Sequence, residues 1–421
     1  MRILFASLGS RGDLNPLLAL AAACRERGHA VSVAAAESFR EQVEASGFAA
    51  WPLRPDVLCA AGQVRHFSDP SKGPERLLRT EVFPASESTY SDLLTAARGA
   101  DLLVVGELLY VAPLVAGTLG VPWVNVILAP SSFLSLSDPC VLAPLPALSR
   151  LGRFSHWPLR AVLALGRHLT ERWARPLRDL ERRLGRTPVA NPVYAGKHSP
   201  HLVLTLFPEF FAPKQTDWPQ NALQTGFPFF QQPSETTLAA DVLAFLDAGP
   251  PPAVFTLGSA VVMMADDFYD LAEEAVGRIG CRAICLVGGN PGPASVSGGI
   301  LRAPYIPLEA VFPRAAAAVH HGGIGSCAMA LRSGIPSVVI PFGYDQPDNG
   351  ARLERLGVAC VVRRRGLTAR LLEQGLRRVL EDGTMSCRAR ELARQIHPDR
   401  DMARSIEAIE QAASPAATHK I

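Results

Sequence analysis

Paired histidines, a glycine-rich turn and a later acid–amide pair are the residues of this chain best suited to chemistry. They lie between Ala316 and Asn349, in AAAVHHGGIGSCAMALRSGIPSVVIPFGYDQPDN. Gly322, Gly323 and Gly325 lack a Cβ, so backbone N–H groups there can approach a bulky phosphate closely. Ser326 stands where the next helix would begin, and unpaired N–H groups at a helix start favour negative charge. The pattern predicts either an anion-binding loop in a β-α-β unit or a plain connecting turn.

The residues flanking this loop favour the anion-binding interpretation. His320 ends the predicted strand 316–319 and would point from its carboxyl edge, where open parallel sheets bind ligands. The next predicted strand, 337–340, is followed by Asp345 and Gln346. A carboxylate and an amide at the same sheet edge are suited to binding hydroxyl groups.

A second loop, GSRGDLNP at residues 9–16, lies between a predicted strand (Arg2–Ser7) and a predicted helix (Leu17–Arg27). Its spacing differs from the G-x-G-x-x-G of dinucleotide-binding proteins, which disfavours a nicotinamide dehydrogenase. Asp13 in this loop has two interpretations. It caps the helix, which the local sequence favours, or it accepts a proton from a hydroxyl as a general base.

The second half of the chain begins a new α/β series near Pro252. Its first strand places Gly258 and Ser259 at a carboxyl end, as FTLGS. Tyr305 precedes a proline-fixed turn just before the glycine-rich loop. Its ring either stacks on a base or packs as an ordinary core aromatic, and the sequence leaves both open.

The composition excludes several classes of protein. The chain has 421 residues, 48% hydrophobic and 19% charged, with a net charge of +3, which is typical of a globular protein and too weakly basic to indicate nucleic-acid binding. The eight cysteines form no CxxC motif and suggest reduced thiols. No group has metal-ligand spacing, so no metal is predicted. Met1 leads directly into a strand, and we expect no signal peptide or membrane span and a cytoplasmic location.

The segment from Ser149 to Arg186 is unusually basic. It carries ten arginines against three acids, with Trp157 and Trp173 and an apolar stripe. Such a helix either covers the core with a solvated face or lies on an anionic membrane surface, at the inner face of the membrane. The residues from Leu53 to Val82 are predicted to be surface loops.

These motifs together resemble the GT-B glycosyltransferases of family 1. The resemblance rests on GSRGDLNP, on YIP before AAAVHHGGIGS and on PFGYDQPDN, and it covers residues 1 to about 400. Asp13, where His is commoner, resembles the branch with glycopeptide-antibiotic and sterol glycosyltransferases. The stretch LFPEFFAPKQTDWPQNALQTGFPFF resembles the rhamnosyltransferase subunit of rhamnolipid synthesis.

The resemblance implies an α/β protein of the GT-B fold, with two facing Rossmann-like domains of parallel sheets and a cleft between them. The acceptor-binding domain would span 1–228, a linker 229–239 and the nucleotide-sugar domain 240–398, with a C-terminal helix and tail at 399–421.

The resemblance also assigns roles to residues. Asp13 would be the general base, in place of a mere cap. The donor would be held by Ser10, Arg11, Gly258, Ser259, Tyr305, His320, Gly322, Gly323, Gly325, Ser326, Asp345 and Gln346. Within this set His320 would contact the diphosphate, Tyr305 would stack on the base, and Asp345 with Gln346 would hold the sugar.

The expected reaction is metal-independent, needs no cofactor and inverts the anomeric carbon. Leu308 and Ala328 replace a Gln and a ribose-binding Glu of the plant pattern, which favours a dTDP-sugar such as dTDP-L-rhamnose. A hydroxyalkanoyl lipid is the favoured hydrophobic acceptor. Two alternatives stay open: UDP-glucose-dependent transfer to a sterol, terpenoid or polyketide, and a non-transferring GT-B binding protein or epimerase.

Overall fold

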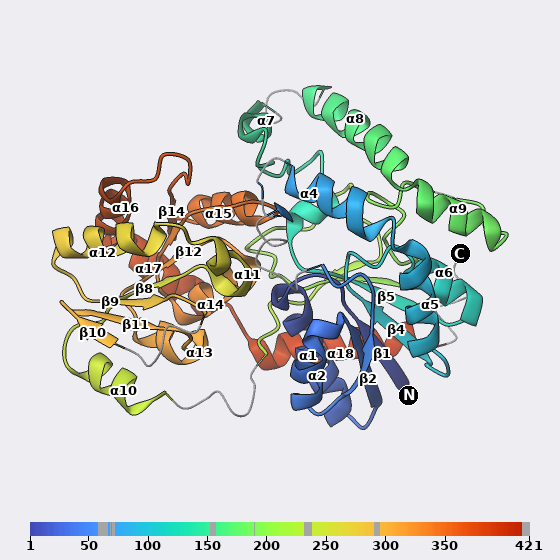
Figure 1. Cartoon of the computed structure of the whole chain (residues 1–421), viewed down its shortest axis with the longest axis horizontal. Helices are drawn as coiled ribbons and strands as arrows, with labels where there is room; N and C mark the ends of the chain where they lie inside the picture. The colour runs from blue at the N-terminus through green and yellow to red at the C-terminus, as the bar shows by residue number, and fades with distance from the viewer. Residues whose placement is uncertain are drawn as a thin grey trace. The chain divides into compact units, whose positions relative to one another are not determined.

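The chain forms two compact units in a computed structural model (Figure 1). The structure describes residues 1–57, 66, 67, 69, 72–151, 157–188, 190–230, 238–289 and 295–414. Unit 1 comprises Met1–Phe67, Ser71–Phe230 and His397–Ile421, and unit 2 comprises Ser68–Pro70 and Gln231–Ile396. Most of the expected linker 229–239, and the expected tail beyond 414, lie outside the described residues.

Unit 1 is built on a seven-stranded parallel sheet, here called sheet A. Its order is β3-β2-β1-β4-β5-β6-β7. The strands predicted near residues 2, 30, 101, 121 and 201 are confirmed, and all are apolar runs typical of a sheet buried on both faces. The bounds are β1 (Arg2–Ala6), β2 (Ala30–Ala35), β3 (Ala49–Pro52), β4 (Leu102–Val105), β5 (Trp123–Ile127), β6 (Leu202–Thr205) and β7 (Ala222–Gln224).

Helices cover both faces of sheet A. One apolar layer joins α1, α2 and the C-terminal helix α18 to the sheet, with Ile406 and Ile409 of α18 buried in it. The opposite layer joins α5, α6 and α9. The bounds are α1 (Arg11–Glu26), η1 (Glu37–Phe39), α2 (Arg40–Ala45), α5 (Ser86–Ala96), α6 (Ala112–Leu119), η3 (Pro130–Phe133), α7 (Pro146–Leu151), α8 (Trp157–Trp173), α9 (Arg175–Arg183) and α18 (Pro398–Ala412).

Unit 2 repeats the architecture with sheet B, in the order β10-β11-β9-β8-β12-β13-β14. All neighbours are parallel except the antiparallel pair β10 and β11. Two α/β units with such sheets confirm the predicted fold class. The bounds are β8 (Ala253–Thr256), β9 (Ala283–Leu286), β10 (Ser295–Ser297), β11 (Ile300–Ala303), β12 (Ala317–His320), β13 (Ser337–Val339) and β14 (Ala359–Val361).

Helices also cover both faces of sheet B. An apolar layer joins α10, α13 and α14 to one face. On the other face Phe255 of β8 packs against Phe268 of α12, and Gly375 of α16 lies against Val338 of β13. The bounds are α10 (Ala240–Asp247), α11 (Gly258–Val261), η5 (Val262–Met264), α12 (Phe268–Ile279), α13 (Leu308–Val311), η6 (Phe312–Arg314), α14 (Ile324–Ser333), α15 (Gln346–Arg355), α16 (Ala369–Glu381) and α17 (Gly383–Ala393).

Two local predictions were wrong. Helix α1 begins at Arg11 and not at Leu17, because a capping box at Ser10 starts the helix and Pro16 is accommodated inside it. The stretch 53–82 is not only surface loop. It contains α4 (Gly73–Arg76) and the π-helical turn η2 (Leu77–Val82), because Val57, Phe67 and nearby apolar side chains form a small buried cluster.

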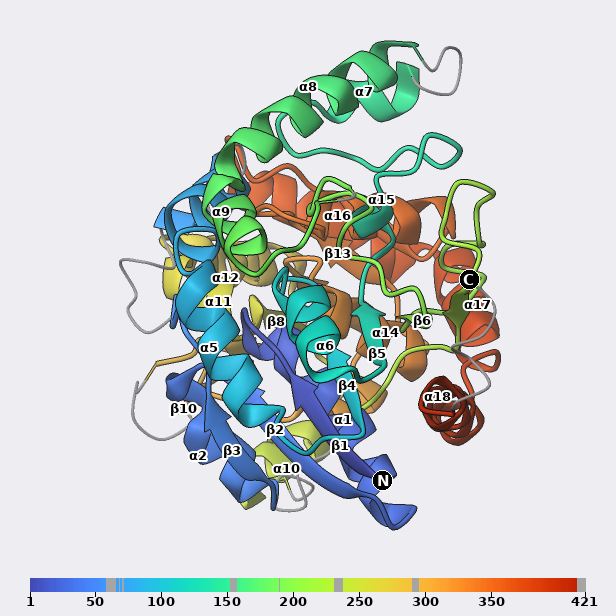
Figure 2. The same cartoon turned by 90° about the vertical axis from the view of Figure 1, so that its right-hand side faces the viewer.

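The basic segment contains α7, α8 and α9. Helix α9 packs in the layer on sheet A, whereas α7 and α8 lie outside that layer (Figure 2). Helix α8 packs on the chain after β5 through Leu159 and Leu163. Trp157 and Leu165 are exposed, at 72% and 59%. No helix in the described part of the chain is both long and apolar enough to span a bilayer.

Candidate active site

Asp13 is the third residue of α1, and Ser10 is its N-cap. The Ser10 hydroxyl accepts from the Gly12 amide, while the Ser10 amide and hydroxyl both donate to Asp13 Oδ2, at 2.7 and 2.8 Å. Asp13 therefore serves the helix start without being the N-cap. Its Oδ1 is not used by these bonds. The Ser10 hydroxyl is occupied locally, and the neighbouring Arg11 is exposed.

Glu107 is a charged neighbour of Asp13 that the sequence did not indicate. It follows β4, the strand beside β1, so both residues lie at the carboxyl edge of sheet A. Its carboxylate accepts from Ser132 Oγ at 2.8 Å and from Lys197 Nζ at 3.1 Å. Lys197 is 8% exposed. Burial raises the pKa of Asp13, and the negative charge of Glu107 raises it further against the hydrogen bonds from Ser10.

A raised pKa makes a carboxylate a better proton acceptor at neutral pH. The raised pKa and the unused Oδ1 are compatible with the general-base role of Asp13, which stays a prediction. The signal that would have found Glu107 is its position directly after a buried strand, next to a glycine.

In unit 2 the glycine-rich loop follows β12 and opens α14. Gly322 has φ +89°, and a Cβ there would lie 2.9 Å from Val339 and 3.0 Å from the Gln346 carbonyl, so only glycine fits. Gly323 is the N-cap of α14. Gly325 is exposed, and Ser326 is 7% exposed. The first turn of α14 thus presents backbone N–H groups where the sequence predicted an anion loop.

His320 lies inside the protein as the last residue of β12. It is 0% exposed, and its Nδ1 accepts from the Gly322 amide at 3.1 Å. That bond assigns the proton of a neutral ring to Nε2, which has no partner among the described residues. Burial, and then the adjacent His321, lower the pKa of His320 to about 3. His320 therefore supports the glycine-rich loop from the protein interior, through its bond with the Gly322 amide.

His321 is the histidine that lies in the loop, and the sequence did not single it out. Its ring lies against Gly323 and Gly258. A Cβ added at Gly258 would come within 2.7 Å of the ring. Gly258 has φ +69°. The side chain is partly exposed, and burial lowers the pKa of His321 to about 4, so the ring is neutral near pH 7. The two glycines, one after β8 and one after β12, make room for this ring at the sheet edge.

The remaining predicted donor residues of unit 2 also follow strands of sheet B. Ser259 is exposed in α11, directly after β8. Tyr305 is 59% exposed in the turn after β11, so it is not a core aromatic.

The acid–amide pair after β13 is arranged differently from the expectation. Gln346 is 7% exposed, and its Oε1 accepts from the Phe342 and Gly343 amides at 2.8 and 3.1 Å. Only its Nε2 remains for a ligand. Asp345 is half-buried, and its Oδ2 accepts from Asn349 Nδ2 at 2.7 Å. Asn349 is a further residue that sequence reasoning missed.

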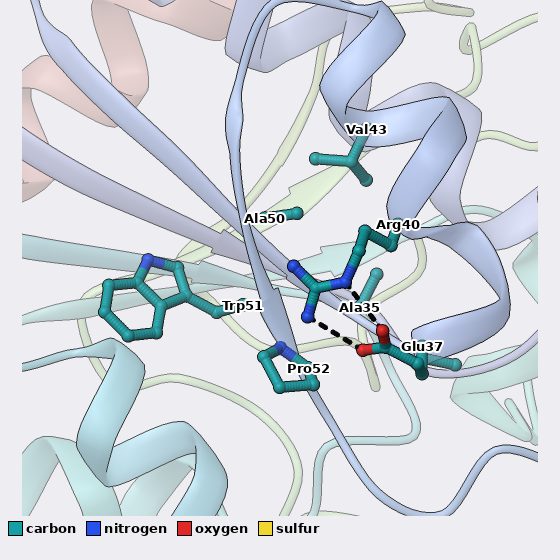
Figure 3. Close-up of a pocket in the computed structure, with 8 residues that line it drawn as sticks. Ala35, Glu37, Arg40, Val43, Ala50, Trp51 and Pro52 are labelled. Atoms are coloured by element: carbon teal, nitrogen blue, oxygen red, sulfur yellow. Dashed lines mark hydrogen bonds and ion pairs between the residues drawn. The ribbon is translucent and has the colours of Figure 1, made fainter.

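Among the hollows of the described surface, two are lined by other residues. One, at the edge strand β3, is lined by eight residues including Trp51 and Pro52, with Arg40 bonded to Glu37 across it (Figure 3). It has no room for a water-sized molecule and is not a candidate site. An open hollow of about 430 Å³ lies along Arg364 to Leu367 in unit 2. There Arg364 stacks on Phe342 at 4.0 Å. The described residues hold no group of three or more His, Cys, Asp or Glu placed to bind a metal ion.

Residues 3–96 match the glycosyltransferase family 28 N-terminal domain, and residues 276–405 match the erythromycin biosynthesis protein CIII-like C-terminal domain. The chain belongs to the GT-B glycosyltransferases and is a transferase.

Among its relatives is O-mycaminosyltylonolide 6-deoxyallosyltransferase of Streptomyces fradiae. The two are 32% identical over 98% of this chain and 97% of the relative. The solved structure of the glycotransferase of kitacinnamycin covers 98% of this chain and 99% of its own, with a TM-score of 0.71 and 19% identity. Glycosyltransferase VinC in complex with dTDP covers 98% and 99%, with a TM-score of 0.68 and 20% identity. These structures support the fold.

Proposed function

We propose that this enzyme transfers a sugar from a dTDP-sugar to a hydroxyl group of a hydrophobic, macrolide-type acceptor, with inversion at the anomeric carbon. The observation that carries the proposal is the arrangement at the carboxyl edge of sheet B. The loop at Gly322–Ser326 and the carboxylate of Asp345 follow the adjacent parallel strands β12 and β13. An anion-binding group and a hydroxyl-binding group are therefore neighbours in one unit.

In this proposal the diphosphate lies at the start of α14. The N–H groups from Gly323 to Ser326 and a neutral imidazole N–H donate to it. We assign that imidazole to His321, since the His320 ring is enclosed. Tyr305 offers an exposed ring to the base, and Ser259 an exposed hydroxyl. Asp345 accepts from the sugar hydroxyls, and Gln346 contributes through Nε2.

The nucleotide is proposed from two observations. Ala328 is buried in α14 at 4% exposed, and the next residue, Met329, lies on the partly exposed side of the helix one turn after Gly325. Neither side chain can accept a hydrogen bond from a ribose 2′-hydroxyl as a carboxylate would. A deoxyribose donor loses nothing there, and VinC, of the same fold, was crystallised with dTDP. UDP-glucose remains the alternative donor.

The proposed chemistry is one displacement. The acceptor O–H gives its proton to Asp13 while its oxygen bonds to the anomeric carbon, and the bond from that carbon to the diphosphate oxygen breaks on the opposite side. The departing diphosphate carries the developing charge to the first turn of α14 and His321. General-base catalysis of this type contributes about 10²- to 10⁴-fold in rate.

The acceptor is proposed from the name of the relative in Streptomyces fradiae. The Streptomyces fradiae enzyme is named for transfer to O-mycaminosyltylonolide, which favours the polyketide alternative over the hydroxyalkanoyl lipid expected from sequence. We retain dTDP-L-rhamnose as one donor among other dTDP-deoxysugars.

The test is a donor and acceptor screen. Thermal-shift measurements with dTDP, UDP and NAD would identify the nucleotide, and we expect stabilisation by dTDP above UDP and none by NAD. Product release would then be followed with dTDP-sugars and either macrolide aglycones or hydroxyalkanoate esters. Donor binding without transfer to any hydroxyl, or epimerised donor, would support the non-transferring alternative.

A further inference from the structure

Asn349 lies in the first turn of α15 and is 0% exposed. Its Nδ2 donates to two acceptors, the Gly322 carbonyl at 3.0 Å and Asp345 Oδ2 at 2.7 Å. Both partners can only accept, so the orientation of the amide is fixed by its contacts. One side chain thus joins the glycine loop after β12 to the carboxylate after β13.

The parts that Asn349 joins are not held by ordinary secondary structure. Gly322 has φ +89°, and its carbonyl also accepts from Cys327 Sγ at 3.4 Å. Tyr344, directly before Asp345, has φ +56°, a strained value for a residue with a Cβ. Asp345 is the N-cap residue of α15, yet its side chain makes no capping bond. The bond from Asn349 therefore orients Asp345 Oδ2 where no capping bond does.

Asn349 is also an unfavourable choice for a purely structural position. Its Oδ1 is buried without a hydrogen-bond partner in the described part of the protein. A buried acceptor without a partner destabilises the folded state, and an apolar side chain of similar volume would avoid this. The geometry gives the amide a role that an apolar residue cannot fill, which is donation to both partners at once.

We propose that Asn349 is a positioning residue that fixes the sugar-holding carboxylate of Asp345 relative to the diphosphate loop at Gly322. This inference rests on the proposed donor site. Asn349 itself need not touch the donor. It acts through Asp345 and the loop, so that the two ends of a sugar diphosphate are bound at a set separation.

The inference predicts a specific pattern of affinities, measured by titration calorimetry with dTDP and with dTDP-glucose. In Asn349→Leu we expect binding of dTDP-glucose to weaken about tenfold and binding of dTDP by no more than about threefold. In Asp345→Ala we expect a similar loss of affinity for dTDP-glucose and none for dTDP. In the double variant the two losses should not multiply, because Asn349 acts through Asp345.

A matched control separates positioning from general destabilisation. Leu353 lies one turn further along α15, is 1% exposed and makes no hydrogen bond to the loop through its side chain. Leu353→Ala should lower the melting temperature while leaving the ratio of dTDP-glucose to dTDP affinity unchanged. Asn349→Ser, with a smaller donor, serves where Asn349→Leu does not fold, and the same affinity ratio should fall.

The outcomes are distinguishable. If the wild-type protein binds neither dTDP nor dTDP-glucose, the proposed donor fails before Asn349 is considered. If it binds both and the variants keep the wild-type ratio, or the losses multiply in the double variant, the positioning role of Asn349 is overturned. A reduced ratio with non-multiplying losses supports it.

Discussion

Ser10 and Asp13 hold each other at the start of α1, with the Ser10 amide and hydroxyl both directed at one carboxylate oxygen, Oδ2 of Asp13. This pair gives Asp13 a fixed orientation and leaves Oδ1 as the oxygen we assign to the acceptor hydroxyl. The same carboxylate therefore serves the helix and the proposed reaction. The two roles can be separated by substitution.

Asp13→Asn should lower kcat by about 10²- to 10⁴-fold, because an amide cannot take the proton. The side-chain oxygen of asparagine can still accept from the Ser10 amide and hydroxyl, so the melting temperature should change little. Steady-state kinetics and dTDP titration check this, with unchanged dTDP affinity expected. Ser10→Ala is the control: it removes a cap worth about 1 kcal/mol while Asp13 keeps its bond to the Ser10 amide. Near wild-type turnover in Asp13→Asn would remove the base assignment.

Glu107→Gln should shift the acid limb of the pH profile of kcat/KM to lower pH. Asp13 acts when ionised, so activity falls as pH drops through its raised pKa. Removing the negative charge of Glu107 lowers that pKa, although burial, its larger cause, remains. Glu107 itself faces Lys197 and the Tyr110 phenol, whose pKa it helps to raise. Glu37→Gln changes an acid that is paired with Arg40 and is not among the groups that shift the pKa of Asp13, so it should leave the limb in place. A limb that stays or rises in Glu107→Gln contradicts the prediction.

His321→Ala should weaken dTDP-glucose binding about tenfold, equivalent to about 1.4 kcal/mol. Since the pKa of His321 is about 4 and that of His320 about 3, both rings stay neutral above pH 5.5. Binding of this donor should therefore be constant from pH 5.5 to 8. A cationic histidine would instead lose affinity as pH rises through its pKa. Calorimetry across that range decides, with His168→Ala on the exposed side of α8 as the control.

Ile409→Ala should destabilise unit 1 by about 2–5 kcal/mol, the usual effect of emptying a buried isoleucine position. Ile409 is 0% exposed and packs in the layer shared with α1. Hydrogen exchange should show lost protection in β5 and β6 and not in sheet B. Leu392→Ala in α17, at 1% exposed, should give the opposite distribution. Equal loss of protection in both units would show that the two units do not unfold independently.

The exposed face of α8 carries our proposal of contact with an anionic membrane. Trp157 and Leu165 are exposed beside Arg160 and Arg172, which complements an anionic surface. In flotation assays we expect binding to vesicles with phosphatidylglycerol and little to neutral ones, reduced in the double variant Trp157→Ser, Leu165→Ser.

The control is Leu243→Ser in α10, which changes another apolar residue that is 37% exposed. This variant should bind the vesicles as the wild type does. Absence of wild-type binding to anionic vesicles would end the proposal.

The sequence was sufficient for features that depend on neighbours along the chain. Apolar runs and glycines located the strands and the loop at Gly322. The sequence was insufficient to tell which of the two histidines lies in the loop, because this depends on a single residue at the end of a strand. Strand β12 includes His320, so the His320 ring is buried and His321 lies in the loop. The sequence was also insufficient where distant segments meet, as when Glu107 pairs with Lys197. The Gln346 side chain is held inward by bonds from the Phe342 and Gly343 amides, and only the folded loop brings these amides to it.

The place of α18 has a consequence for how the protein is made. Unit 1 holds nearly all of residues 1–230 and also the helix that begins at Pro398. Domains generally form as their sequence leaves the ribosome. The unit that is translated first therefore cannot close its apolar layer until unit 2 has been translated in full. During that interval the side chains that Ile406 and Ile409 later cover must be shielded by other means, and premature termination after unit 2 would leave the N-terminal unit, not the C-terminal one, prone to aggregation.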